Sequence, residues 1–201
     1  MVWLNGLDMG DGYSNVTIAT GAARVFLDTG SAMSHFPSDI LEAIVDQIGA
    51  SSAKHDLNST IYITECSSLK DQTFTFDFMG YKMTIPVSGF VVEQNGSNCT
   101  LGFGDPVDLD SDWNLGQPFL NNAYVVFDLD NNEVALALRN TESTDEDIEV
   151  ITDSVPSATQ APDYSSDYNQ LSTWGLTLAT ESRNGVKSSG DDATATSLGF
   201  T

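Results

Sequence analysis

The sequence contains very little positive charge. Among its 201 residues, 7 are Lys or Arg and 29 are Asp or Glu, which gives a formal net charge of −22 and a pI near 4.1. A nucleic acid or an anionic membrane surface would repel such a chain, because it has no basic cluster to bind phosphates. Hydrophobic residues still make up 40% of the sequence, enough for a packed core. The composition therefore predicts an acidic folded protein that binds neither partner.

Long apolar runs are also missing. No stretch of about 18 apolar residues occurs, so the sequence predicts no transmembrane helix. Residues 1–8 lack the basic region and the apolar stretch of a secretory signal. Residues 198–201 lack the apolar tail of a GPI signal.

Other features are typical of secreted proteins. Four N-x-[ST] sequons begin at Asn15, Asn58, Asn95 and Asn98, and each is a candidate for glycosylation. The two cysteines, Cys66 and Cys99, could close a disulfide or remain two buried thiols. Secretory features without a secretory signal predict that this chain is part of a longer protein.

Histidine and cysteine are too few to predict a metal site. His35 and His55 share no metal-ligand spacing. The acidic residues Asp108, Asp110 and Asp112 lack the Gly and Glu of an EF-hand loop. No G-x-S-x-G nucleophile motif and no phosphate-binding glycine motif occurs. The sequence predicts neither a metal nor a cofactor.

The composition changes near residue 140. Residues 1–140 alternate apolar and polar side chains and carry frequent turn residues, whereas residues 141–201 are rich in Ser, Thr and Asp. Such a segment buries too little apolar surface to offset the entropy of ordering it. We expect one folded domain over 1–140 and a low-complexity, acidic, disordered tail over 141–201.

The folded part is predicted to be mostly β with one short helix. Alternating residues predict a hairpin across Met79-Gly80 and a second hairpin from strands 123–128 and 133–138. Residues 25–27 and 61–63 read as short strands. The apolar spacing of Leu41, Ile44, Val45 and Ile48 predicts a helix that begins after Ser38 as N-cap and stops at Gly49.

The motif with the clearest chemistry is residues 25–32 (VFLDTGSA). A buried strand ends at Asp28, and Gly30 permits a tight turn with hydroxyl residues on both sides. A carboxylate held by such donors can act as a general base toward water. By itself, however, D-T-G is more typical of an ordinary β-turn.

The surrounding order of motifs resembles the C-terminal lobe of a pepsin-like (family A1) aspartic protease. The D-T-G is followed by the predicted helix, then by residues 114–120 (NLGQPFL), and then by the hairpin 124–138. The resemblance covers about residues 2–140 and is greatest to fungal secreted members of the yapsin, barrierpepsin and candidapepsin type.

The resemblance implies an aspartic endopeptidase that cleaves peptide substrates at acidic pH and is secreted or held at the cell surface or wall. It implies that Asp28 is catalytic, that Thr29, Gly30 and Ser31 support it, and that Cys66 pairs with Cys99. Ala32 departs from the family pattern, because Ser or Thr is usual at that position. The missing hydroxyl predicts weaker hydrogen-bond support of Asp28.

The family mechanism needs two aspartates that share one proton, and this chain contains only one D-[ST]-G. The first lobe and the flap hairpin are not in the sequence, so we expect no peptidase activity from the monomer. Three hypotheses stay open. The missing lobe belongs to the same precursor or to a separate chain, or two copies pair as a homodimer, or the chain is a non-catalytic glycoprotein or binding module of the cell wall.

Overall fold

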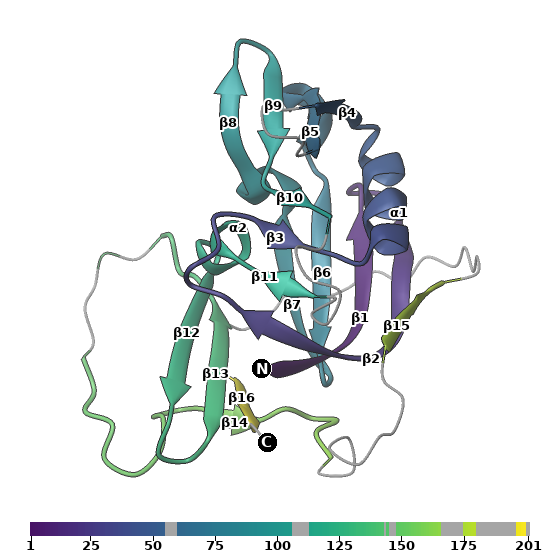
Figure 1. Ribbon diagram of the computed structural model, residues 1–201. Helices are drawn as coiled ribbons and strands as arrows, with labels where there is room; N and C mark the ends of the chain where they lie inside the picture. The colour runs from purple at the N-terminus through teal and green to yellow at the C-terminus, as the bar shows by residue number, and fades with distance from the viewer. Residues whose placement is uncertain are drawn as a thin grey trace.

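The computed structural model describes residues 1–54, 60–105, 113–142, 144, 148–165, 175–179 and 196–199. It is mostly β, as the sequence predicts (Figure 1). The elements are, in chain order, β1 (Val2–Gly10), β2 (Asn15–Leu27), β3 (Ser34–His35), α1 (Ser38–Ile48), β4 (Ser51–Lys54), β5 (Thr60–Glu65), the 3₁₀ turn η1 (Cys66–Leu69), β6 (Thr73–Phe78), β7 (Tyr81–Pro86), the 3₁₀ turn η2 (Val87–Phe90), β8 (Val91–Asn95), β9 (Asn98–Leu101), β10 (Phe103–Gly104), β11 (Asn114–Leu115), α2 (Gln117–Leu120), β12 (Ala123–Asp128), β13 (Glu133–Leu138), β14 (Thr159–Gln160), β15 (Gly175–Leu178) and β16 (Thr196–Gly199).

The described strands form three sheets. The largest has the order β10-β3-β11-β2-β1-β6-β7, with β15 paired to β2. The second has the order β4-β5-β9-β8 and the third the order β12-β13-β16-β14. In Figure 1 the β8–β9 hairpin and the β12–β13 hairpin extend from opposite ends of the large sheet.

The two predicted hairpins are confirmed. β6 pairs with β7 through a turn in which Met79 and Gly80 both have positive φ, as a two-residue hairpin turn requires. β12 and β13 have the predicted bounds and pair along their whole length.

The predicted helix is confirmed as α1, but its N-cap is wrong. Pro37 is the cap residue and Ser38 is already the first helical residue, because the Pro37 carbonyl accepts the first helical hydrogen bond, from Leu41 N–H, at 2.8 Å. Gly49 ends the helix in the left-handed conformation, as predicted. The short helix α2 is an addition that the sequence did not predict.

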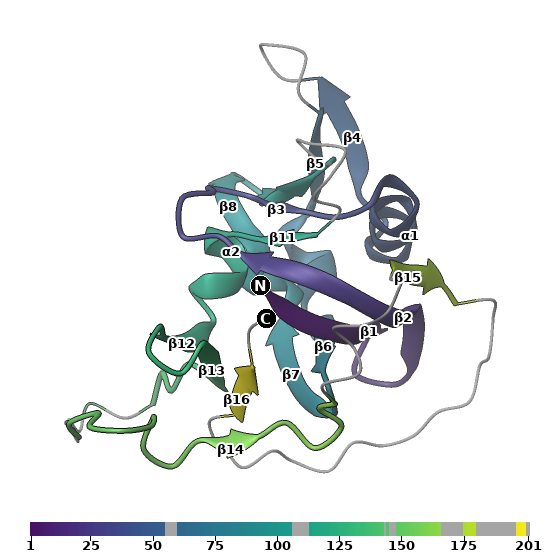
Figure 2. The same ribbon diagram turned by 60° about the horizontal axis from the view of Figure 1, so that its bottom comes forward.

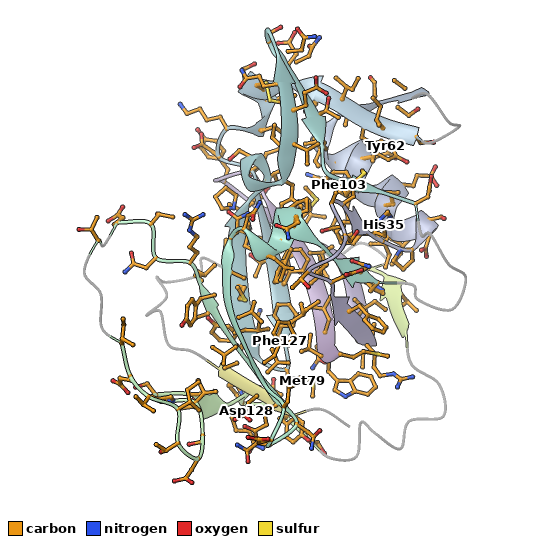
Figure 3. The ribbon with its side chains drawn as sticks, turned by 60° about the vertical axis from the view of Figure 1, so that its left-hand side comes forward. His35, Tyr62, Met79, Phe103, Phe127 and Asp128 are labelled. Carbon is orange, nitrogen blue, oxygen red and sulfur yellow. A yellow bond between two sulfur atoms is a disulfide. The ribbon has the colours of Figure 1, made fainter. Side chains whose placement is uncertain are left out.

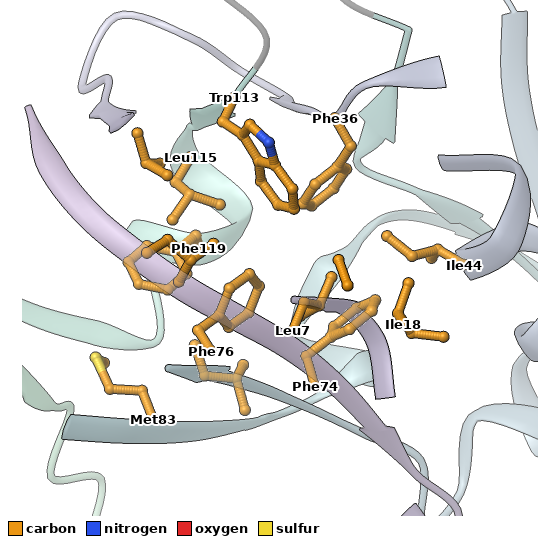
Figure 4. Close-up of a cluster of buried hydrophobic side chains, with 14 of the residues drawn as sticks. Leu7, Ile18, Phe36, Ile44, Phe74, Phe76, Met83, Trp113, Leu115 and Phe119 are labelled. Atoms are coloured by element: carbon orange, nitrogen blue, oxygen red, sulfur yellow. The ribbon is translucent and has the colours of Figure 1, made fainter. Parts of the chain in front are cut away.

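An aromatic core joins the large sheet to α1 and α2 (Figure 4). The rings of Phe36 and Trp113 meet edge to face at 5.4 Å, and those of Phe76 and Phe119 at 5.2 Å. The phenylalanines of β6 are fully buried, so this stripe belongs to the core and is not a ligand-binding surface.

The disulfide that the family resemblance implies is present. Cys66 and Cys99 are bonded, with a Cα–Cα distance of 5.1 Å, and close a loop of 33 residues. The bond joins η1 to β9, next to the ladder in which Thr64 of β5 pairs with Cys99. A loop of this length contributes about 3–4 kcal/mol in the chain-entropy account.

Several described segments of the tail pack against the domain. Ala161 is buried, and the Asp163 N–H donates to the Met79 carbonyl at 2.8 Å. β15 pairs with β2, and β16 pairs with β13 (Figure 2). The prediction of a disordered tail therefore does not extend to these segments. Their backbone groups are satisfied at sheet edges, an interaction that depends little on side-chain composition.

Candidate active site

The Asp28 loop, residues 28–33 between β2 and β3, lies where three strands meet. β11 lies between β2 and β3, parallel to β2 and antiparallel to β3. Its residue Asn114 is the register partner of both Phe26 and His35. The Asp28 N–H continues the β2–β11 pairing by donating to the Leu115 carbonyl at 3.0 Å. The end of β2 is thus fixed by β11, which lies far along the chain.

Alternation along β11 decides which side chains reach the loop. Trp113 and Leu115 are buried and point into the aromatic core (Figure 4). Because successive side chains of an extended chain point to opposite faces, Asn114 between them faces the other way. Its Nδ2 donates to Asp28 Oδ2 at 2.8 Å.

Both oxygens of the half-buried Asp28 carboxylate accept hydrogen bonds. Oδ2 accepts from Asn114, and Oδ1 accepts from the Gly30 N–H at 2.9 Å. These donors favour the charged form, with Asn114 having the largest effect. They hold the pKa of Asp28 below its usual value, against desolvation, with smaller help from the Ser31 N–H and the charge of His35.

The rest of the loop is hydrogen-bonded to Gly116 and to Gln117, the first residue of α2. The Ser31 carbonyl accepts from the Gln117 N–H at 2.9 Å, and the Thr29 carbonyl accepts from Gln117 Nε2 at 3.2 Å. The Gly116 N–H donates to Oγ of the fully buried Ser34 at 3.1 Å. A Cβ at Gly116 would overlap the Met33 carbonyl and lie 2.7 Å from that of Ser31. Glycine is what allows the two segments to approach so closely.

The predicted support residues take different places. Gly30 donates to the Asp28 carboxylate. Ser31 donates its N–H to the Asp28 carbonyl at 3.3 Å, but its hydroxyl donates to the Met33 carbonyl at 2.7 Å and not to the carboxylate. Thr29 is exposed at the tip of the loop. The catalytic role of Asp28 and the support roles of the other three stay predictions.

An open apolar hollow of about 340 Å³ lies beside the loop. It is lined by Thr29, Gln117, Leu120, Asn121 and four residues of β12, including Tyr124 and Phe127. Tyr124 is 64% exposed and Phe127 is 41% exposed. Exposed aromatic side chains that gather beside a hollow make Tyr124 and Phe127 candidates for an interaction surface.

Asn114 is the site residue to which sequence reasoning gave no role. It stood within the quoted motif at residues 114–120, and the signal was a polar residue between the apolar Trp113 and Leu115. That Asn114 reaches Asp28 depends on the β2–β11 register, which the local pattern does not contain.

The other candidates lie elsewhere. Asn15, Asn95 and Asn98 are exposed, as glycosylation requires. Asn58, His55 and Asp108, Asp110 and Asp112 lie outside the described residues. His35 Nδ1 is 2.7 Å from the Asp105 carbonyl. Within the described ranges no three potential ligands cluster as a metal site, and no helix is long and apolar enough to span a membrane.

Comparison with known proteins identifies the family. The family model described as eukaryotic aspartyl protease matches residues 2–139. The chain belongs to the eukaryotic aspartyl protease family. It is 34% identical to Aspartic proteinase 3 of Saccharomyces cerevisiae over 199 residues, which covers 97% of this chain and 34% of that protein. It is 32% identical to Aspartic proteinase yapsin-3 of the same yeast, over 86% of this chain and 33% of that protein.

A solved structure shows the same fold. The aspartic proteinase from Irpex lacteus superposes with a TM-score of 0.55 at 18% identity, over 71% of this chain and 44% of that one. The chain spans about a third of the length of the curated relatives reported above. The predicted relationship to fungal pepsin-like proteases is therefore confirmed, as is the mostly β fold.

Proposed function

We propose that this chain provides the C-terminal lobe of a secreted aspartic endopeptidase, with Asp28 as one of its two catalytic aspartates. The observation that carries the proposal is the setting of Asp28. Its half-buried carboxylate has a donor on each oxygen and stands in a loop whose exposed tip borders an open apolar hollow. A turn aspartate without a catalytic role needs neither the long-range clamp nor the hollow.

The reaction follows from two such carboxylates facing each other. They hold one proton between them, because two like charges at contact distance do not both ionise. The ionised carboxylate takes a proton from water as the water attacks the peptide carbonyl, and the protonated one donates its proton to the carbonyl oxygen. The second aspartate comes from another lobe, in the same precursor or in a separate chain.

The exposed face beside the loop supports a docked lobe. Phe26, Tyr124 and Phe127 are 43%, 64% and 41% exposed. Phe26 lies on β2, which leads into the Asp28 loop, and the other two lie on β12, which lines the hollow beside Thr29. A partner that covered these rings would gain about 25 cal/mol for each Å² of apolar surface removed from water. The disulfide and the exposed sequons support a protein that passes through an oxidising compartment.

The test compares the chain alone with a reconstituted pair. The purified chain is incubated with a protein substrate between about pH 3 and 6, with and without a separately expressed N-terminal lobe of Aspartic proteinase 3. We expect cleavage only when both are present, and none with Asp28→Asn. Association is measured separately by light scattering.

The other outcomes decide between the remaining hypotheses. Cleavage by the chain alone, abolished by Asp28→Asn and accompanied by a dimer in light scattering, would replace the second lobe with a second copy. A stable complex that cleaves nothing at any of these pH values would contradict the proposal and favour the non-catalytic binding module.

A further inference from the structure

Asn114 carries an inference that goes beyond the catalytic role of Asp28. Its backbone is held on both sides, by Phe26 of β2 and by His35 of β3. Its side chain therefore approaches Asp28 from a fixed position, and the carboxylate does not depend on a mobile loop for its second donor. The pairing of β11 with β2 and β3 therefore fixes the position of the donor in the 2.8 Å hydrogen bond to Oδ2.

The orientation of the Asn114 amide is determined by charge. Its Oδ1 is buried and, among the described residues, has no hydrogen-bond partner. A flipped amide would satisfy that oxygen no better and would place it against the negative Asp28 carboxylate. The NH₂ group, which only donates, must therefore face Asp28.

An unpartnered buried oxygen is a cost to stability that an apolar residue at this position would not carry. Trp113 and Leu115 on either side are apolar and fully packed, so nothing in the packing of this segment calls for an amide. The interaction with Asp28 is what the amide contributes.

Other side chains near the loop are engaged elsewhere. The Ser31 hydroxyl donates to the Met33 carbonyl, and Ala32 has no hydroxyl to offer. His35 on β3 has its Nδ1 2.7 Å from the Asp105 carbonyl. Among the described residues, it is the Asn114 side chain that donates to Asp28 Oδ2.

We propose that Asn114 is a positioning residue that keeps Asp28 as the ionised member of the aspartate pair. Protonating Asp28 would turn one acceptor oxygen into a hydroxyl and cost it the Asn114 or the Gly30 hydrogen bond. These two hydrogen bonds therefore favour placing the shared proton on the carboxyl of the other lobe. Asp28 acts as the base toward water and the partner aspartate acts as the acid. This assignment of roles rests on the proposed function, whereas the effect of Asn114 on Asp28 does not.

The chain alone tests the effect on Asp28. Carboxyl ¹³C titration of the 201-residue chain follows Asp28, whose signal is identified by its loss in Asp28→Asn. We expect Asn114→Leu to raise the pKa of Asp28. Asn114→Asp keeps the shape but replaces the donor with a carboxylate, so we expect it to raise the pKa as well. A role in filling space alone would leave the pKa of Asp28 unchanged in Asn114→Leu, because leucine fills nearly the same space without a donor.

The chain offers a matched control. Asn131 Nδ2 donates to Asp128 Oδ2 at the same distance, 2.8 Å. Asn131→Leu should raise the pKa of Asp128 and leave Asp28 unchanged. The proposal is overturned if Asp28 titrates alike in wild type and Asn114→Leu while Asn131→Leu shifts the pKa of Asp128. Amide spectra of each variant establish that it is folded.

The reconstituted pair tests the assignment of roles. With the second lobe present, Asn114→Leu should move the acid limb of the pH profile of kcat/KM to higher pH. The alkaline limb should stay at the same pH. An unchanged acid limb, with Asp28 shifted in the isolated chain, would overturn the assignment alone. Absence of cleavage in wild type would contradict the proposed function, and the titration would still decide whether Asn114 positions Asp28.

Discussion

Two aspartates of this protein are held in nearly the same way. Asp28 accepts from Asn114 Nδ2 at 2.8 Å and from the Gly30 N–H at 2.9 Å. Asp128 accepts from Asn131 Nδ2 at 2.8 Å and from the Asn131 N–H at 3.0 Å. In both cases the asparagine side chain is the largest cause of a pKa below the usual value. Their settings are nevertheless different.

The difference lies in where the donors come from and what lies alongside. Asn131 is three residues from Asp128 in a hairpin turn, whereas Asn114 comes from a strand 86 residues beyond Asp28. Asp128 is buried at the end of the β12–β13 hairpin, remote from His35, which is Asn114's strand partner (Figure 3). A depressed pKa alone therefore does not mark an active site. A depressed pKa that long-range packing maintains beside an open hollow is the more informative sign.

The largest effect expected from this comparison is on activity. In the reconstituted pair, Asp28→Asn should lower kcat/KM by at least about a thousandfold, because it removes a general base. Asp128→Asn should leave kcat/KM within about twofold of wild type and lower the melting temperature, because it weakens the turn. Equal losses of activity in the two variants, measured at matched folded fractions, would mean that Asp28 has no special role.

The next effect separates close packing from local turn chemistry. Gly116→Ala should cost about 3 kcal/mol, the upper part of the range for overpacking, because the added methyl meets backbone atoms of Ser31 and Met33. At the Asp128 turn, Asn132 has a φ of 53°, and Asn132→Ala should cost about 1 kcal/mol because alanine tolerates that conformation less well. Urea unfolding of both variants measures the two costs. If Gly116→Ala lowers the free energy of unfolding no more than Asn132→Ala does, the Asp28 loop and Gly116 are not closely packed.

Local patterns predicted the parts of the fold that depend on local interactions. The hairpin at Met79-Gly80, the apolar face of α1 and the Gly49 stop each depend on a few neighbouring residues. The D-T-G turn at Asp28 is of the same kind. The cap of α1 was misplaced by one residue, because Ser is a preferred N-cap residue type whereas the Pro37 carbonyl is the one that accepts the first helical hydrogen bond.

The features that local patterns missed depend on register across long distances. The insertion of β11 between β2 and β3 follows from pairing between strands that lie far apart in the sequence. It brings Asn114 into contact with Asp28, which lies 86 residues before it. The same holds for the tail, where Ala161 is buried against the domain and β15 pairs with β2.

A third carboxylate sharpens the comparison, since its pKa moves in the opposite direction. Asp77 accepts from the Gly80 N–H at 2.7 Å and lies 4.0 Å from Lys82 Nζ. The Gly80 hydrogen bond and the Lys82 charge lower the pKa of Asp77, but burial has a larger effect in the opposite direction. Burial, together with the negative charges of Asp163 and Asp8, raises the pKa of Asp77 above its usual value. Because folding lowers the pKa of Asp28 and of Asp128, their ionised carboxylates stabilise the fold above the unfolded-state pKa of about 3.9. That stabilisation is lost as the pH falls through the folded-state pKa. The protonated Asp77 side chain stabilises the fold below its unfolded-state pKa. That stabilisation is lost as the pH rises through the raised folded-state pKa.

Asp77→Asn should accordingly stabilise the chain at pH 7 relative to wild type, by less than about 1 kcal/mol because Lys82 offsets part of the repulsion. At pH 3, where the wild-type carboxyl is mostly protonated, the two proteins should unfold at the same urea concentration. Asp163→Asn should act in the same direction by a smaller amount, because Asp163 is only one contributor and its N–H, which docks the tail on Met79, is unchanged. A difference between Asp77→Asn and wild type that is equal at both pH values would show that the side chain acts through packing and not through its charge.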